Sequence, residues 1–171
     1  MPLATLRDVG YPARLLPFLS TLIFALVSVV PINLPGFAVV TPAFALMAVF
    51  HWTIYRPDLM PLTAVFAIGL LLDIINGTPY VGLSALTLLV ARTFVMTQRR
   101  FFVNRTFPVV WLGFLAVTVA NFALVWALVS MLRGTLLGFR PFLFQAVLTV
   151  SCYPVGSYVL ARAHRAFLIR A

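Results

Sequence analysis

The amino-acid sequence predicts an all-α integral membrane bundle of six transmembrane helices, with both termini in the cytoplasm. Of its 171 residues, 63% are hydrophobic and 9% are charged, and the mean hydropathy is +1.11. A soluble globular domain is about 45–50% apolar and about 25% charged, so this composition excludes that class. At roughly 20 residues per spanning helix, the length allows about six spans in one transmembrane domain, without a sizeable soluble domain.

Six apolar runs follow one another along the chain, and we expect a helix in each: 15–32, 37–54, 59–76, 78–97, 107–132 and 141–163. Strands rarely exceed about ten residues, and the runs lack the alternating polarity of outer-membrane strands. The first run is too long for the apolar core of a secretory signal, so we interpret it as a retained helix. Prolines near the start of a run are tolerated because the first helical N–H groups have no partner within the helix. Pro42 and Pro154 lie inside runs and predict kinks.

The arginines predict the orientation. All twelve basic residues are arginine, and cytoplasmic loops carry an excess of positive charge. With six crossings and a cytoplasmic N-terminus, ten arginines lie in the cytoplasm, and only Arg133 and Arg140 lie outside. This pattern indicates a multi-pass membrane protein with both termini in the cytoplasm. It also explains the net charge of +9 without a nucleic-acid partner.

Asp73 is the only acidic residue within an apolar run. Because an aspartate at a helix centre costs about 2.5–3.5 kcal/mol on insertion scales, we expect a specific role, either structural glue or recognition of a partner. Gly69, Asp73 and Asn76 or Gly77 recur at helical spacing, which predicts a small polar face for close packing against another helix. Asn76 and Gly77 predict a tight outer turn, and Gly82 follows at the start of the next helix, where tight packing explains its small size.

Two basic segments face the cytoplasm in this topology. Arg56 and Asp58 form the turn between the second and third runs, where Asp58 is a candidate N-cap. We interpret the neighbouring aromatic residues, His51, Trp52 and Tyr55, as an interfacial belt. A longer basic loop, near 98–106, carries aromatic residues between its arginines, which are Arg99, Arg100 and Arg105. We expect this loop to contact anionic lipid headgroups.

The sequence lacks the patterns that catalysis requires. The three aspartates belong to different segments, and a phosphate-binding loop, a His-Glu-x-x-His motif and an aspartate-rich magnesium motif are all missing from the printed sequence. One cysteine excludes an internal disulfide framework and a multi-cysteine metal site. We therefore expect neither enzymatic activity nor a cofactor or metal.

The segment from about 41 to 86 resembles MreD, the rod shape-determining membrane protein family of bacteria. The resemblance rests on Pro42, on His51-Trp52 and Arg56-Pro57-Asp58, on the spacing Gly69-x-x-x-Asp73-x-x-x-Gly77, and on the segment that begins at Gly82. Length and six apolar runs agree with it. The resemblance implies a multi-pass protein of the bacterial inner membrane, without enzymatic activity, that works with MreC and the actin-like MreB. With RodA and a class B penicillin-binding protein, these direct sidewall peptidoglycan synthesis.

Two functions of different classes follow. The first is a non-catalytic scaffold of the elongation (rod) complex that binds MreC and helps to control cell shape. A homo-oligomer is compatible with this function. The second is a vitamin-capture subunit of a membrane transporter, because the bundle is also similar to the substrate-binding subunits of energy-coupling-factor transporters. Such a subunit needs convergent polar groups at the outer face, whereas the predicted outer loops are short and apolar.

Overall fold

The structure is a computed structural model that describes the backbone of residues 11–29, 41–103 and 105–168 and the side chains of residues 17–29, 41–103 and 105–162. The described part of the chain forms six α-helices and one short 3₁₀ turn, which confirms the all-α prediction. In chain order they are α1 (Tyr11–Val29), α2 (Phe44–Tyr55), η1 (Pro57–Leu59), α3 (Leu62–Ile75), α4 (Leu83–Phe102), α5 (Phe107–Arg133) and α6 (Arg140–Leu168).

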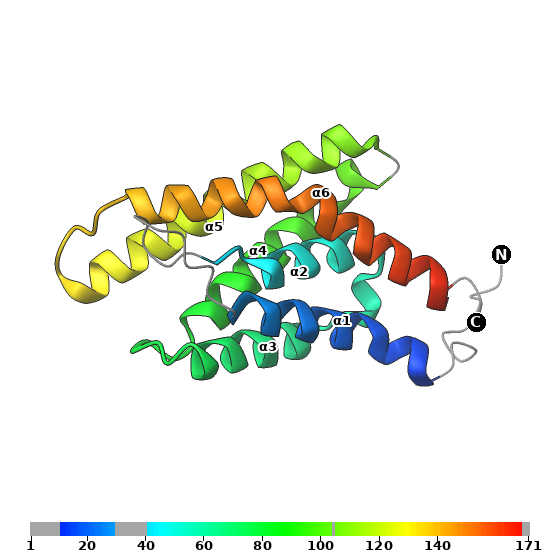
Figure 1. Cartoon of the computed structure of the whole chain (residues 1–171), viewed down its shortest axis with the longest axis horizontal. Helices are drawn as coiled ribbons and strands as arrows, with labels where there is room; N and C mark the ends of the chain where they lie inside the picture. Colours follow the sequence, from blue (N-terminus) through cyan, green and yellow to red (C-terminus); the bar gives the residue numbers. More distant parts are fainter. Residues whose placement is uncertain (1–10, 30–40, 104, 169–171) are drawn as a thin grey trace.

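Successive helices run in opposite directions, so that α1 begins and α6 ends at the same end of the bundle (Figure 1). The centre is α2, which packs against α1, α4, α5, α6 and η1. Every residue from Ala45 to Ile54 is buried, because α2 is apolar on all sides and neighbours cover each side. Around it, the ring of Phe50 lies 5.2 Å from that of Phe114, which stacks on Tyr153 at 4.2 Å. These rings join α2, α5 and α6 in one core.

Two helices of the described chain are long and apolar enough to cross a membrane, over Phe107–Arg133 and Arg140–Arg162. The apolar helices Phe44–Tyr55 and Leu62–Ile75 are shorter. At 1.5 Å per residue, the 12 residues of α2 extend about 18 Å, less than the roughly 30 Å of a bilayer core. The expectation of six spans therefore stays a prediction.

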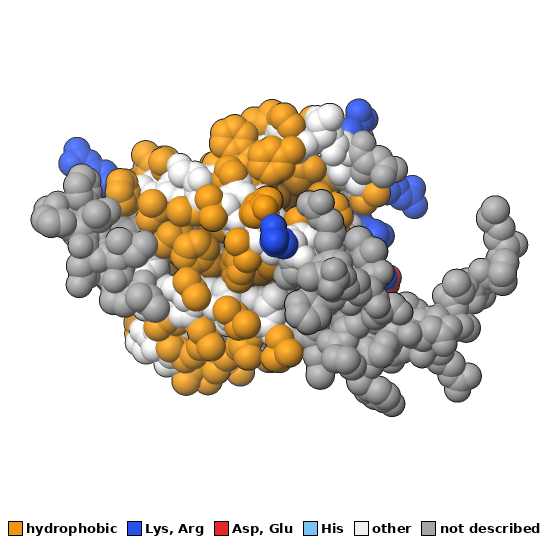
Figure 2. All heavy atoms as spheres, turned by 45° about the vertical axis from the view of Figure 1, so that its right-hand side comes forward, with side chains coloured by type: hydrophobic (Ala, Val, Ile, Leu, Met, Phe, Trp, Pro, Cys, Tyr) orange, Lys and Arg blue, Asp and Glu red, His pale blue; other side chains and the backbone are white. Residues whose placement is uncertain are grey.

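The surface is apolar over much of the bundle. Figure 2 shows hydrophobic side chains covering the middle of one face, with most of the visible arginines toward one end. Leu112, Val119 and Val155 are among the exposed hydrophobic side chains of the bundle. An apolar patch of this extent marks a membrane or protein contact.

Several predicted boundaries need correction, and proline explains three of them. The second helix begins at Phe44 rather than at 37, so Pro42 precedes it instead of kinking it; residues 37–40 lie outside the described part. The third begins at Leu62 rather than at 59, because η1 and Pro61 come before it. The fourth begins at Leu83 rather than at 78 and continues to Phe102, since residues that include Pro79 form a turn.

The outer helices agree better with the predicted runs. The fifth helix, Phe107–Arg133, matches its run of 107–132 within one residue, and the sixth extends to Leu168 instead of ending at 163, with Pro154 inside it as expected. The first begins at Tyr11 rather than at 15, and residues 30–32 of its run lie outside the described part.

Side chains of α1 and α6 hold the start of α2. The backbone N–H groups of Ala43 and Ala45 donate to the hydroxyls of Thr149 (3.0 Å) and Ser28 (3.3 Å). The side-chain amide of Gln145 donates to the Thr41 carbonyl at 2.8 Å. The first N–H groups of a helix have no partner within it, and in a membrane the protein itself must supply one.

Candidate functional site

The side chain of Asp73 closes the hairpin between α3 and α4. Its carboxyl oxygens accept hydrogen bonds from the backbone N–H of Gly82 at 2.8 Å and of Ser84 at 3.1 Å. The hydroxyl of Thr78 lies 3.4 Å from the same group. Since Gly82 is the N-cap of α4, the last turn of α3 provides the cap that α4 lacks in its own sequence. An acidic side chain is favoured at a helix N-terminus.

Gly69 brings the two helices together one turn before Asp73. A Cβ atom at Gly69 would lie 2.7 Å from the backbone nitrogen of Ala85 and closer still to its Cα atom, so that only glycine fits here. Because Gly69 and Asp73 are four residues apart, they lie on the same side of α3. The glycine permits close packing, and the acid then reaches the first turn of α4.

The remaining residues of this predicted face form the turn. Asn76 is the C-cap of α3, and Gly77 follows with a φ of +60°, which confirms the positive φ expected there. Gly82 has a φ of +101° with no atom within 4 Å of the Cβ it lacks. Its small size therefore serves backbone conformation and not tight packing, which is a correction; Ala85 provides the packing instead.

Asp73 is 1% exposed and Gly69 is buried, whereas Asn76 and Gly77 are exposed. A partner helix can therefore reach the turn but not the Asp73 carboxyl group. The geometry favours structural glue for Asp73, and its recognition by a partner stays a prediction that this burial opposes.

The arginines near the other end divide into two kinds. The Nε atoms of Arg99 and Arg92 donate to the carbonyls of Ile54 (2.8 Å) and Met60 (3.0 Å), which binds α4 to the end of α2 and to the start of α3. Arg100 and Arg105 are exposed. The segment expected as a loop near 98–106 is helical up to Phe102, so Arg99 and Arg100 lie in the last turn of α4, where positive charge is favourable.

The turn between α2 and α3 also differs from expectation. Arg56 is half-buried and Asp58 is exposed, and the N-cap of α3 is Pro61, without a side-chain cap. Asp58 therefore does not cap α3. His51 and Trp52 are 4% and 0% exposed, so these two are core residues and do not belong to an interfacial belt, whereas Tyr55 is exposed. The indole N–H of Trp52 donates to the Ser20 hydroxyl of α1 at 2.9 Å.

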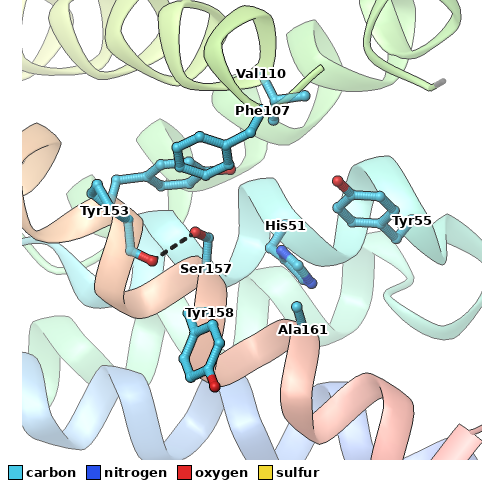
Figure 3. Close-up of a pocket in the computed structure, with 9 residues that line it drawn as sticks. His51, Tyr55, Phe107, Val110, Tyr153, Ser157, Tyr158 and Ala161 are labelled. Carbon is cyan, nitrogen blue, oxygen red and sulfur yellow. Dashed lines mark hydrogen bonds between the residues drawn. The ribbon is translucent and has the colours of Figure 1, made fainter. Parts of the chain in front are cut away.

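A cavity of about 510 Å³ lies between α2, α5 and α6, and sequence reasoning did not find it. Figure 3 shows His51 and Tyr55 of α2 on one side, Phe107 and Val110 of α5 above, and residues of α6 from Tyr153 to Ala161 closing the rest. We call it the aromatic cavity. The proline inside α6, Pro154, is one of its lining residues and was the signal that could have located it.

A second, smaller cavity, of about 180 Å³, lies near the Asp73 hairpin, with lining residues from all six helices or the segments beside them. We call it the polar cavity, because its wall includes Ser28, Thr41, Ser84, Asn121 and Gln145. The Oδ1 atom of Asn121 is buried and accepts no hydrogen bond. Among the described residues, no three His, Cys, Asp or Glu side chains are grouped as metal ligands would be.

The comparison with protein families decides the identity. The family model described as rod shape-determining protein MreD matches residues 12–155. The chain belongs to the MreD family. The match includes the whole α3–α4 hairpin, whereas the part of the aromatic cavity formed by Ser157, Tyr158 and Ala161 lies beyond it. No curated protein and no solved structure matches the chain.

Membership in the MreD family makes the chain a rod shape-determining membrane protein. This agrees with the two helices that are apolar and long enough to span a membrane. The expected likeness of the bundle to energy-coupling-factor subunits has no support among these comparisons.

Proposed function

We propose that the chain is a non-catalytic scaffold of the cell-elongation complex in the inner membrane, and that it binds MreC. The observation that carries the proposal is the match of the MreD family model over residues 12–155. Through MreC, the scaffold acts with MreB, RodA and a class B penicillin-binding protein on sidewall peptidoglycan synthesis. The arginine distribution supports a cytoplasmic position for both termini.

The surface we assign to the partner is a face of α5. Four alanines follow one another there at intervals of four, three and four residues, and all four are exposed: Ala116, Ala120, Ala123 and Ala127. These intervals keep the alanines on one side of a helix. Small residues let two helix backbones approach closely in a membrane, where packing and not the hydrophobic effect drives association. Because Gly69 and Asp73 are buried, this exposed face replaces them as the proposed contact.

Co-purification of MreC with tagged variants in a mild detergent tests the proposal. Ala120→Ile and Ala123→Ile together place larger side chains between α5 and the partner helix and keep the two apart. We expect the amount of co-purified MreC to fall at least about tenfold, which corresponds to a loss of about 1.4 kcal/mol in binding free energy. Ala67→Ile is the matched control, because Ala67 is an exposed alanine on α3. Full recovery of MreC with the double variant would refute the α5 contact, and failure of the wild type to retain MreC would refute the scaffold function.

One observation favours the alternative function, capture of a small molecule. The polar cavity collects neutral hydroxyl and amide groups around the unpaired Oδ1 atom of Asn121, and a buried acceptor requires a donor. The test is whether a small molecule that co-purifies with the protein raises the melting temperature of the wild type but not that of Asn121→Leu. This result would favour small-molecule capture over the scaffold function. Unchanged melting temperatures in both would exclude capture.

A further inference from the structure

The aromatic cavity differs in chemistry from the rest of the bundle. Its wall is mainly aromatic and apolar, with His51 and Tyr55 on one side. The ring of Phe107 lies 6.3 Å from that of Tyr153, with an angle of 19° between their planes. The Ser157 hydroxyl donates to the Pro154 carbonyl of its own helix at 3.0 Å, so it is already engaged (Figure 3). A wall of this kind is suited to an apolar body, with little polar recognition inside the cavity.

Positive charge lies at the rim. The guanidinium of Arg162, an exposed residue, donates to the Tyr158 hydroxyl at 3.3 Å, and Tyr158 lines the cavity. A guanidinium carries five N–H donors, so Arg162 retains donors for an anion. Of the two aspartates in the described chain, Asp73 belongs to the hairpin and neither lines this cavity.

We propose that the aromatic cavity holds one anionic phospholipid from the cytoplasmic leaflet, with an acyl chain against Phe107 and Tyr153 and its phosphate at Arg162. Arginine recognises phosphate through charge-assisted hydrogen bonds, often two at once. The leaflet follows from the orientation proposed above, and the binding site itself does not depend on MreC.

The size of the cavity favours a lipid over a partner helix. A helix is about 10 Å in diameter with a pitch of 5.4 Å, so that one turn fills roughly 420 Å³. The cavity of about 510 Å³ is therefore close to the volume of one helical turn, and the rest of a longer partner helix would lie outside it. A single acyl chain is thin and flexible, and it can enter the aromatic cavity from the surrounding membrane.

Lipid retention measures this directly. The full-length protein is reconstituted in nanodiscs containing equal amounts of phosphatidylglycerol and phosphatidylcholine, re-extracted in detergent, and its bound lipid is counted by mass spectrometry. We expect one retained lipid per wild-type chain, enriched in phosphatidylglycerol. Ala161→Phe fills the cavity and should abolish retention, whereas Val159→Phe, at an exposed position of α6 outside the cavity wall, should not.

Arg162→Leu tests the contact with the lipid headgroup separately from the contact with the acyl chain. Because Arg162 is exposed, we expect the variant to fold. It should keep a lipid but shift the retained lipid toward equal amounts of phosphatidylglycerol and phosphatidylcholine. Both lipids carry a phosphate, but only phosphatidylcholine adds a choline cation, which the guanidinium repels. Equal retention by wild type and Ala161→Phe, or an unchanged preference in Arg162→Leu, would overturn the proposal. So would photocrosslinking from position 161 to a protein segment in place of a lipid.

Discussion

Replacing Asp73 tests the role that the structure assigns to it. Asp73→Leu removes the acceptor for two backbone N–H groups, those of Gly82 and Ser84. Both N–H groups belong to partly buried residues, and a hydrogen bond contributes about 0.5–1.5 kcal/mol net, so we expect a loss of about 1–3 kcal/mol in hairpin stability. Asp73→Asn keeps one acceptor oxygen at the same position, and we expect about half of that loss.

The assay is native-state hydrogen exchange in detergent, read at the first turn of α4. Protection of Ser84 and its neighbours should fall in Asp73→Leu, fall less in Asp73→Asn, and stay unchanged at the centre of α2. Insertion into the membrane should persist in both variants, because the apolar runs are unaltered. If exchange at α4 is the same in all three proteins while MreC binding is lost, Asp73 recognises a partner and the capping interpretation is wrong.

Two further substitutions test close packing and the support of α2. Gly69→Val places atoms against the Ala85 backbone; overpacking of this kind costs about 1–3 kcal/mol or more, so the melting temperature in detergent should fall below that of Ala67→Val, an exposed site on the same helix. A melting temperature equal to that of the control would show that α3 and α4 do not pack closely there. Thr149→Val leaves the Ala43 N–H without its hydroxyl partner and should cost about 1–3 kcal/mol, whereas Thr149→Ser should keep most of the stability. Equal loss in both would mean that the methyl group, and not the hydroxyl, matters.

The number and order of the helices could be predicted because the apolar runs are long and the breaks between them are clear. The turn at Asn76-Gly77 could be predicted because Gly77 needs a positive φ. The start of the fourth helix was misplaced because the segment after Gly77 is apolar enough to extend the run, while Gly82 sets the cap through its own φ of +101°.

The chemistry of the site depended on tertiary contacts. The importance of Asp73 was predictable from its cost in an apolar run, but its hydrogen-bond donors come from residues nine and eleven positions later. The burial of Trp52 was not predictable, since a helix that is apolar on all sides suits both a core and a membrane surface. The aromatic cavity is formed by residues of α2, α5 and α6 together, which Pro154 alone does not determine.

The scaffold function in cell elongation is tested most directly by depleting the protein. The experiment uses a rod-shaped bacterium in which the protein is the sole member of its family. Cell shape and the sites of new wall are recorded with a fluorescent D-amino acid as depletion proceeds. The scaffold account predicts that rods become round while wall synthesis loses its sidewall pattern, and that Asp73→Asn restores rods better than Asp73→Leu. Rods that keep their width and sidewall pattern but require an added vitamin for growth would contradict it.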